Sequence, residues 1–171
     1  LDISTGEFLV AQGSISYIDK LLQGFKPTEV ILCKKQRNDF IEQFGSQYYT
    51  YFLEEWRYTG DYACETLLKH FEVSSMKGSG VDRMTAGIVA AGVALHYLNE
   101  TEHRNLQHIS TLSRIEEDRF MWLDRFTIRN LELIGSMNEN AVTLSDVLDH
   151  TASPMGARLL KRWIVMPLKD K

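Results

Sequence analysis

Four carboxylates are of the kind that a metal-dependent nuclease uses: Asp2, Glu54, Asp61 and Asp82. Such an enzyme needs several carboxylates that converge on metal ions about 3.5–4 Å apart. These four lie in separate stretches of the chain, and nothing in their spacing makes them converge. Asp61 is also well placed to cap a helix. A metal-dependent nuclease therefore stays an alternative function and is not the preferred one.

Other sequence patterns that carry chemistry are missing. There is no G-x-x-x-x-G-K-[ST] loop for nucleotide phosphates and no G-x-S-x-G turn for a serine nucleophile. The two cysteines are too few for a four-ligand metal site. No metal-ligand spacing connects the five histidines, which are His70, His96, His103, His108 and His150. We predict no catalytic site, metal or cofactor within these residues.

A cluster of cations lies near the end of the chain, at Arg158, Lys161 and Arg162. On a helix, residues at positions i, i+3 and i+4 share one face, and such a face could contact DNA phosphates. The same pattern is typical of the solvated face of a packed helix, which is the preferred interpretation. The three residues are kept as a candidate DNA-phosphate or structural face.

Aromatic residues are concentrated between positions 48 and 58. Base stacking by a single-strand binder would need these rings inside a positively charged groove. Only Arg57 stands among them, beside Glu54 and Glu55, so packing of strand aromatics against helices is preferred. The cluster consists of Tyr48, Tyr49, Tyr51, Phe52, Trp56 and Tyr58.

The elements that would position these residues alternate over the first 71 positions. Short apolar runs predict strands within residues 1–12, 29–33 and 48–53. Helical spacing predicts a helix from Ile15 that ends before Pro27, a second that closes at Gly45, and a third that Asp61 caps. Strands that alternate with helices predict an α/β layer with a partly parallel sheet.

The rest of the chain is predicted to be mainly helical. Residues 81–98 form one long helix whose small residues would let it lie tightly against the sheet. The last helix is predicted to start with Ser153 as N-cap and Pro154 at its first position. Its apolar stripe contains Leu159 and Trp163, which would form an exposed patch for self-association if nothing covers them. The full stripe is Met155, Leu159, Trp163 and Met166.

Composition narrows the class of protein. The chain has 171 residues, 44% of them hydrophobic, and a net charge of −4, which suits one globular domain or a small domain with an appendage. A sequence pI near 5.7 argues against an autonomous nucleic-acid binder. No apolar run approaches the roughly 20 residues of a membrane span, and two cysteines suit a reduced, cytoplasmic compartment.

Because the chain begins at Leu1 and ends at Lys171, we expect a fragment of a longer protein.

Several motifs resemble the MutS family of DNA mismatch repair proteins, in the family's order along the whole chain. Residues 1–8, LDISTGEF, are similar to the first hairpin of the family's connector domain. Residues 129–133, RNLEL, and 144–151, LSDVLDHT, resemble the opening of its core domain. Residues 153–163, SPMGARLLKRW, look like a characteristic helix of that domain. Residues 78–80, GSG, depart from the family pattern, which usually has an aromatic residue between these glycines.

The resemblance implies a fold and a role. The fold is an α/β, ribonuclease H-like connector domain over residues 1–106, with a mixed sheet and a truncated first strand. The N-terminal, mainly α part of the core or lever domain follows over 107–171. The fragment would relay conformational change between the mismatch-binding and ATPase domains and offer a surface to MutL. The full-length protein would bind mismatched double-stranded DNA as a homodimer and would use ATP and Mg²⁺.

The helix that starts near Asp61 carries the candidate MutL contact. Tyr62, Glu65, Thr66 and Lys69 are predicted to share one polar face. An ordinary solvated face is the alternative interpretation. The opposite, apolar face is predicted to bury Cys64, Leu67, Leu68 and Phe71.

Overall fold

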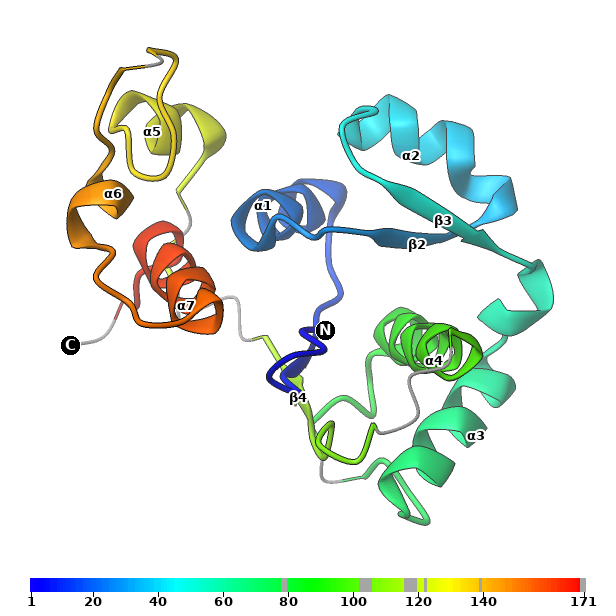
Figure 1. Cartoon of the computed structure of the whole chain (residues 1–171). Helices are drawn as coiled ribbons and strands as arrows, with labels where there is room; N and C mark the ends of the chain where they lie inside the picture. Colours follow the sequence, from blue (N-terminus) through cyan, green and yellow to red (C-terminus); the bar gives the residue numbers. More distant parts are fainter. Residues whose placement is uncertain (78–79, 102–105, 116–119, 122, 139, 170–171) are drawn as a thin grey trace. The chain divides into compact units, whose positions relative to one another are not determined.

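The computed structural model describes residues 1–77, 80–101, 106–115, 120–121, 123–138 and 140–169 (Figure 1). Its contacts divide the chain into two compact units. Unit 1 contains Leu1–Ser14 and Pro27–Ile115, and unit 2 contains Ile15–Lys26 and Glu116–Lys171. The first predicted helix therefore belongs to unit 2, although the segments before and after it belong to unit 1. No helix in the described part of the chain is long and apolar enough to cross a membrane.

Short parallel strand pairs supply the β-structure of unit 1. β1 (Phe8–Val10) pairs with β4 (Leu112–Arg114), and β2 (Val30–Cys33) pairs with β3 (Thr50–Leu53). Within the described residues these pairs are two separate sheets, which differs from the single mixed sheet that the sequence predicts. No described strand lies between them to join the two pairs.

Helix α2 (Arg37–Phe44) follows β2 through a short 3₁₀ turn, η1 (Lys34–Gln36). It ends at Gly45, whose φ of 87° is a conformation that glycine adopts without strain. The predicted stop at Gly45 is confirmed.

Helix α3 (Gly60–Phe71) follows β3 through a second 3₁₀ turn, η2 (Glu55–Tyr58). The capping position is occupied by Thr59, so the prediction that Asp61 caps this helix is wrong. Asp61 is the second helical residue, where a carboxylate still interacts favourably with the positive end of the helix dipole.

Helix α4 (Thr85–Glu100) begins later than the predicted start at residue 81. Its first turn is capped from a distance by Gln12, in the loop after β1. The Gln12 Oε1 atom accepts hydrogen bonds from the backbone N–H groups of Ala86 and Gly87, at 3.0 and 3.2 Å. These N–H groups have no partner inside a helix, so the Gln12 amide does what an N-cap side chain does.

Helices α3 and α4 pack closely against each other (Figure 1). A Cβ atom added at Gly92 would lie only 2.5 Å from the Cα of Ala63. The sequence predicts that this slim helix lies against the sheet, whereas the structure places its closest approach on α3. The core cluster of unit 1 consists of Phe8, Val10, Leu67, Met76, Val81, Met84, Ala91, Leu95, Leu98, Leu106, Ile109 and Leu112.

The described part of unit 2 is mainly helical. Gly24 and Met166 bring the first and last of its helices together, since a Cβ at Gly24 would lie 3.4 Å from the Met166 sulfur. The helices are α1 (Ile15–Phe25), α5 (Arg125–Asn130), α6 (Leu144–Leu148) and α7 (Pro154–Val165).

Side-chain caps start helices α6 and α7 of unit 2. The Ser153 hydroxyl accepts a hydrogen bond from the Gly156 N–H at 3.2 Å, and Pro154 is the first residue of α7, as predicted. At α6, Thr143 and Asp146 form a reciprocal capping box. The hydrogen bonds from Thr143 lower the pKa of the Asp146 carboxyl below its ordinary value.

The apolar stripe of α7 is buried at one end only. Met166 is 4% exposed, whereas Met155, Leu159 and Trp163 are 44%, 37% and 62% exposed. The exposed patch that the sequence predicts for an uncovered α7 is therefore present.

Candidate partner-binding site

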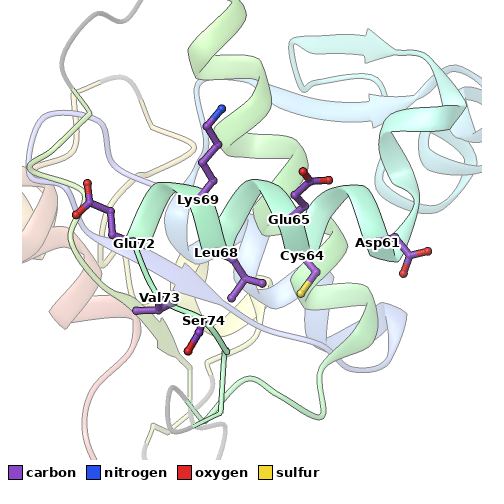
Figure 2. A pocket seen from close by; sticks show the side chains of 8 residues that line it. All are labelled: Asp61, Cys64, Glu65, Leu68, Lys69, Glu72, Val73 and Ser74. Atoms are coloured by element: carbon purple, nitrogen blue, oxygen red, sulfur yellow. The ribbon is translucent and has the colours of Figure 1, made fainter.

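A shallow groove runs along α3 (Figure 2). In Figure 2, Cys64 and Leu68 lie on one side of the helix, and Glu65 and Lys69 lie on the other. The groove thus combines an apolar strip with charged groups beside it. It is lined by Asp61, Cys64, Glu65, Leu68, Lys69, Glu72, Val73 and Ser74.

The end of α3 completes the groove. Glu72 adopts a left-handed conformation with a φ of 54°, and the N–H of Val73 then donates to the Leu68 carbonyl at 3.1 Å. This reversal brings Val73 and Ser74 back beside the helix. Val73 is 43% exposed, so it adds accessible apolar surface next to Leu68.

The structure brings together only part of the predicted polar face. Glu65 and Lys69 are exposed and line the groove. Tyr62 and Thr66 are half-buried. Thr66 donates its hydroxyl to the Tyr62 carbonyl at 2.8 Å, which leaves Glu65 and Lys69 as the accessible members.

The buried face of α3 is rotated from the predicted one. Its centre is formed by Ala63 and Leu67, which are both 0% exposed. Cys64 and Leu68, predicted to be buried, are half-buried and line the groove instead. The close approach of α4 to Ala63 is the physical reason for this rotation.

A chain of polar side chains joins the start of α3 to the end of α4. The Tyr62 Oη atom lies 2.7 Å from the His96 Nδ1 atom. The His96 Nε2 atom lies 3.2 Å from the Glu100 Oε1 atom, which also accepts a hydrogen bond from Arg57 Nη2 at 2.6 Å. Only the i, i+4 spacing of His96 and Glu100 is visible in sequence, and the contribution of Arg57 has no local signal.

Burial governs the charge state of His96. Its side chain is 12% exposed, and this desolvation lowers its pKa below the ordinary value. The Glu100 carboxylate opposes that effect, and the Arg57 guanidinium adds to it. Both effects are smaller than desolvation, so the ring is neutral at neutral pH. Burial likewise raises the pKa of the nearby Tyr58 hydroxyl.

The predicted basic face of α7 is split between two environments. Arg158 and Lys161 are exposed, while Arg162 is half-buried. The Arg162 guanidinium carbon lies 5.8 Å from the centre of the Phe25 ring. Arg162 therefore contributes to the packing of α1 against α7 by a cation–π contact.

The four predicted nuclease carboxylates occupy different settings. The Asp2 carboxylate accepts a hydrogen bond from the Ser4 N–H at 2.9 Å, Glu54 forms an ion pair with Lys34, and Asp82 is exposed. Asp61 lies in the α3 groove. Across the described ranges, no three His, Cys, Asp or Glu side chains are grouped as metal ligands would be.

Two family models match the chain. Residues 1–110 match "MutS domain II", and residues 126–171 match "MutS domain III". Together the matches cover most of the chain, in the order that the sequence motifs predict.

Curated relatives are similar over almost the whole chain. A "DNA mismatch repair protein MutS" from Flavobacterium johnsoniae is 57% identical over 170 residues, which is 99% of this chain. Proteins of the same name from Cytophaga hutchinsonii and Phocaeicola vulgatus are each 56% identical, over 99% and 100% of the chain. The chain spans only 20% of the length of these relatives. None of these matches supports the nuclease alternative. The chain belongs to the MutS family, and its two matched regions are domain II and domain III of that family.

Proposed function

We propose that this chain is an internal segment of a mismatch repair protein that relays conformational change between mismatch-binding and ATPase domains. The observation that carries the proposal is the succession of domain II and domain III matches along one chain. A segment that joins two domains can couple distant sites when each ligand favours a different arrangement. In the full-length protein, these ligands would be mismatched double-stranded DNA and ATP with Mg²⁺.

We propose further that residues 1–106 form a ribonuclease H-like connector domain without catalytic activity of its own. The alternation of short parallel strands with helices supports this fold. Among the described residues, no three His, Cys, Asp or Glu side chains are grouped as metal ligands would be, which supports the lack of a metal-dependent activity. The full-length protein is proposed to be a cytoplasmic homodimer that hydrolyses ATP.

The groove on α3 is our proposed docking surface for MutL. It offers an apolar strip at Cys64, Leu68 and Val73, with Glu65 and Lys69 accessible beside it. Apolar contacts surrounded by charged groups are typical of transient protein interfaces. The charges would set the orientation and association rate of the partner, and the strip would supply most of the affinity.

A charge swap tests this docking surface. In the full-length protein, the double variant Glu65→Lys with Lys69→Glu keeps the net charge and an i, i+4 pair, but reverses the charge pattern that MutL would meet. We expect the affinity for MutL, measured by surface plasmon resonance, to fall by about tenfold. The control is Glu42→Lys on the exposed side of α2, which should leave the affinity unchanged. An unchanged affinity in the double variant would remove the proposal.

DNA binding and cleavage by the chain itself distinguish the proposed relay, which requires neither, from the nuclease alternative. Fluorescence anisotropy with a G·T mismatch duplex and its homoduplex, in the presence of Mg²⁺, should show no mismatch preference, and a gel should show intact DNA. Cleavage that Asp2→Asn abolishes would support the nuclease alternative. Binding that is independent of the mismatch, weakened by salt and by Lys161→Glu, would assign a phosphate contact to the basic face of α7.

A further inference from the structure

The Trp56 side chain is exposed to solvent, yet its ring contacts three neighbouring side chains. Its side chain is 54% exposed. Its ring packs edge-on against Tyr62 and His96, with ring centroids 5.1 and 6.1 Å apart. The Arg57 guanidinium carbon lies 4.6 Å from the centre of the Trp56 ring. An exposed aromatic ring fixed in one orientation loses little entropy on binding a partner.

The neighbours of His96 select one of its two neutral forms. The Glu100 carboxylate only accepts hydrogen bonds, so the adjacent Nε2 carries the hydrogen. Nδ1 is then an acceptor, and the Tyr62 hydroxyl donates to it. Nε2 of the neutral ring lies 3.2 Å from the Glu100 carboxylate without the alignment of a hydrogen bond, so this contact is a charge–dipole attraction.

Protonation of His96 would reverse the direction of the hydrogen bond between Nδ1 and the Tyr62 hydroxyl. Both ring nitrogens would then carry a hydrogen, and Nδ1 would face the Tyr62 hydroxyl as a donor. The Tyr62 oxygen could accept from that N–H, but the Tyr62 O–H would lose Nδ1 as its acceptor and would have to turn toward another one. The positive ring would also lie beside the Arg57 guanidinium, which shares the Glu100 carboxylate with it. The charged and titratable groups around the ring are therefore Tyr62 from α3, Glu100 from α4 and Arg57 from η2.

We propose that His96 is a positioning residue whose neutral ring holds Tyr62 and Trp56 in place at the start of α3, and whose protonation loosens both. The consequence for MutL rests on the proposed function, because the two rings matter for docking only if the partner binds along α3. The positioning itself is a property of unit 1 and is testable without a partner.

The first test is an NMR titration of the chain from pH 8 to pH 5. We expect His96 to titrate below its ordinary pKa of about 6.5, and the Trp56 indole and Tyr62 ring signals to move with the same midpoint. His96→Gln should abolish these movements, while the control His150→Gln, at an exposed position, should leave them intact. If the NMR signals of Trp56 and Tyr62 do not shift as His96 titrates, the proposal is wrong.

A second variant tests whether the Tyr62 hydroxyl stabilises the neutral form of His96. Tyr62→Phe keeps the ring and removes the donor to Nδ1, so the neutral form of His96 loses its partner. The pKa of His96 should therefore rise relative to the unmodified chain. A merely structural role for Tyr62 predicts no such rise. An unchanged or lower pKa in this variant would contradict the proposed positioning.

The third test uses the full-length protein and MutL at pH 7.5 and at one pH unit below the midpoint that NMR gives for His96. Affinity should fall about three- to tenfold at the lower pH, because one or two loosened side chains would have to be immobilised again on binding. His96→Gln should remove most of that loss. If the NMR coupling holds but neither this pH change nor the Glu65–Lys69 charge swap alters affinity, the docking proposal fails and the positioning role of His96 stands.

Discussion

Gly92 of α4 lies directly against Ala63 of α3, where the two long helices of unit 1 pack together. A Cβ at Gly92 would lie 2.5 Å from the Ala63 Cα atom and 2.7 Å from its carbonyl oxygen. These are backbone atoms, so no side-chain rotation can relieve the contact. The contact determines which face of α3 is buried and leaves Cys64 and Leu68 in the groove.

Gly92→Ala should destabilise unit 1, because the added methyl group collides with the backbone of Ala63. We expect the free energy of unfolding to fall by about 1–3 kcal/mol, despite the better helix propensity of alanine. Urea denaturation measures the change. The matched control is Gly60→Ala, which has no described atom within 4 Å of the new Cβ and should be neutral or slightly stabilising. Equal stability of the two variants would contradict the close approach.

Gln12→Ala should weaken the start of α4. The variant leaves the N–H groups of Ala86 and Gly87 without their acceptor, which should cost about 1 kcal/mol, as for other helix caps. Gln12→Glu keeps an acceptor oxygen and adds a negative charge at the helix N-terminus, so it should preserve or increase stability. Thermal unfolding compares the two variants, and a greater loss for glutamate than for alanine would exclude this capping role.

Tyr97 donates its hydroxyl to the Glu29 carboxylate at 2.7 Å. This hydrogen bond, with burial and the Glu29 charge, raises the pKa of Tyr97 to about 12. Because the folded-state pKa lies above the ordinary value of about 10, the stabilisation is fully present below pH 10. It is lost as the pH rises from about 10 to about 12.

Tyr97→Phe should therefore lower the free energy of unfolding by about 1 kcal/mol at pH 8. The variant should also remove the phenol that titrates near pH 12 from an ultraviolet titration. Tyr49→Phe is the control, since Tyr49 is 70% exposed and its loss should leave stability unchanged. If Tyr97→Phe unfolds at the same urea concentration as the Tyr49 control, the hydrogen bond contributes nothing.

The exposed stripe of α7 should make the chain self-associate. Met155, Leu159 and Trp163 present a continuous apolar surface on one helix face. We expect the sedimentation coefficient to increase with concentration, and Trp163→Glu to suppress the increase. Met137→Glu, at an isolated apolar side chain that is 81% exposed, should have little effect. A monomer over a wide concentration range would argue against association through α7.

Local features of the fold were predictable because their causes lie within a few residues. Gly45 ends α2 through its own backbone conformation, and Ser153 starts α7 by accepting a hydrogen bond from Gly156, three residues later. Pro27 follows the end of α1 at Phe25. The motif order that indicates the MutS family is likewise a property of the linear sequence.

The candidate site was only partly predictable. Glu65 and Lys69 lie on the exposed side of α3, as the helical pattern indicates. The same pattern did not reveal that Ala63 would be the buried centre, because that depends on the glycine of another helix. A binary apolar pattern gives little weight to an alanine, although a small residue is what close helix packing requires.

Sequence alone thus determined the end of α2, the start of α7, the family and the exposed charges of α3. Only the tertiary structure decided that His96 would contact Tyr62, 34 residues away, and that Gln12 would cap a helix 74 residues away. It also decided that α1 joins unit 2. Hydrogen bonds and steric limits within one helical turn act in any fold, whereas contacts between distant segments exist only after packing has brought them together.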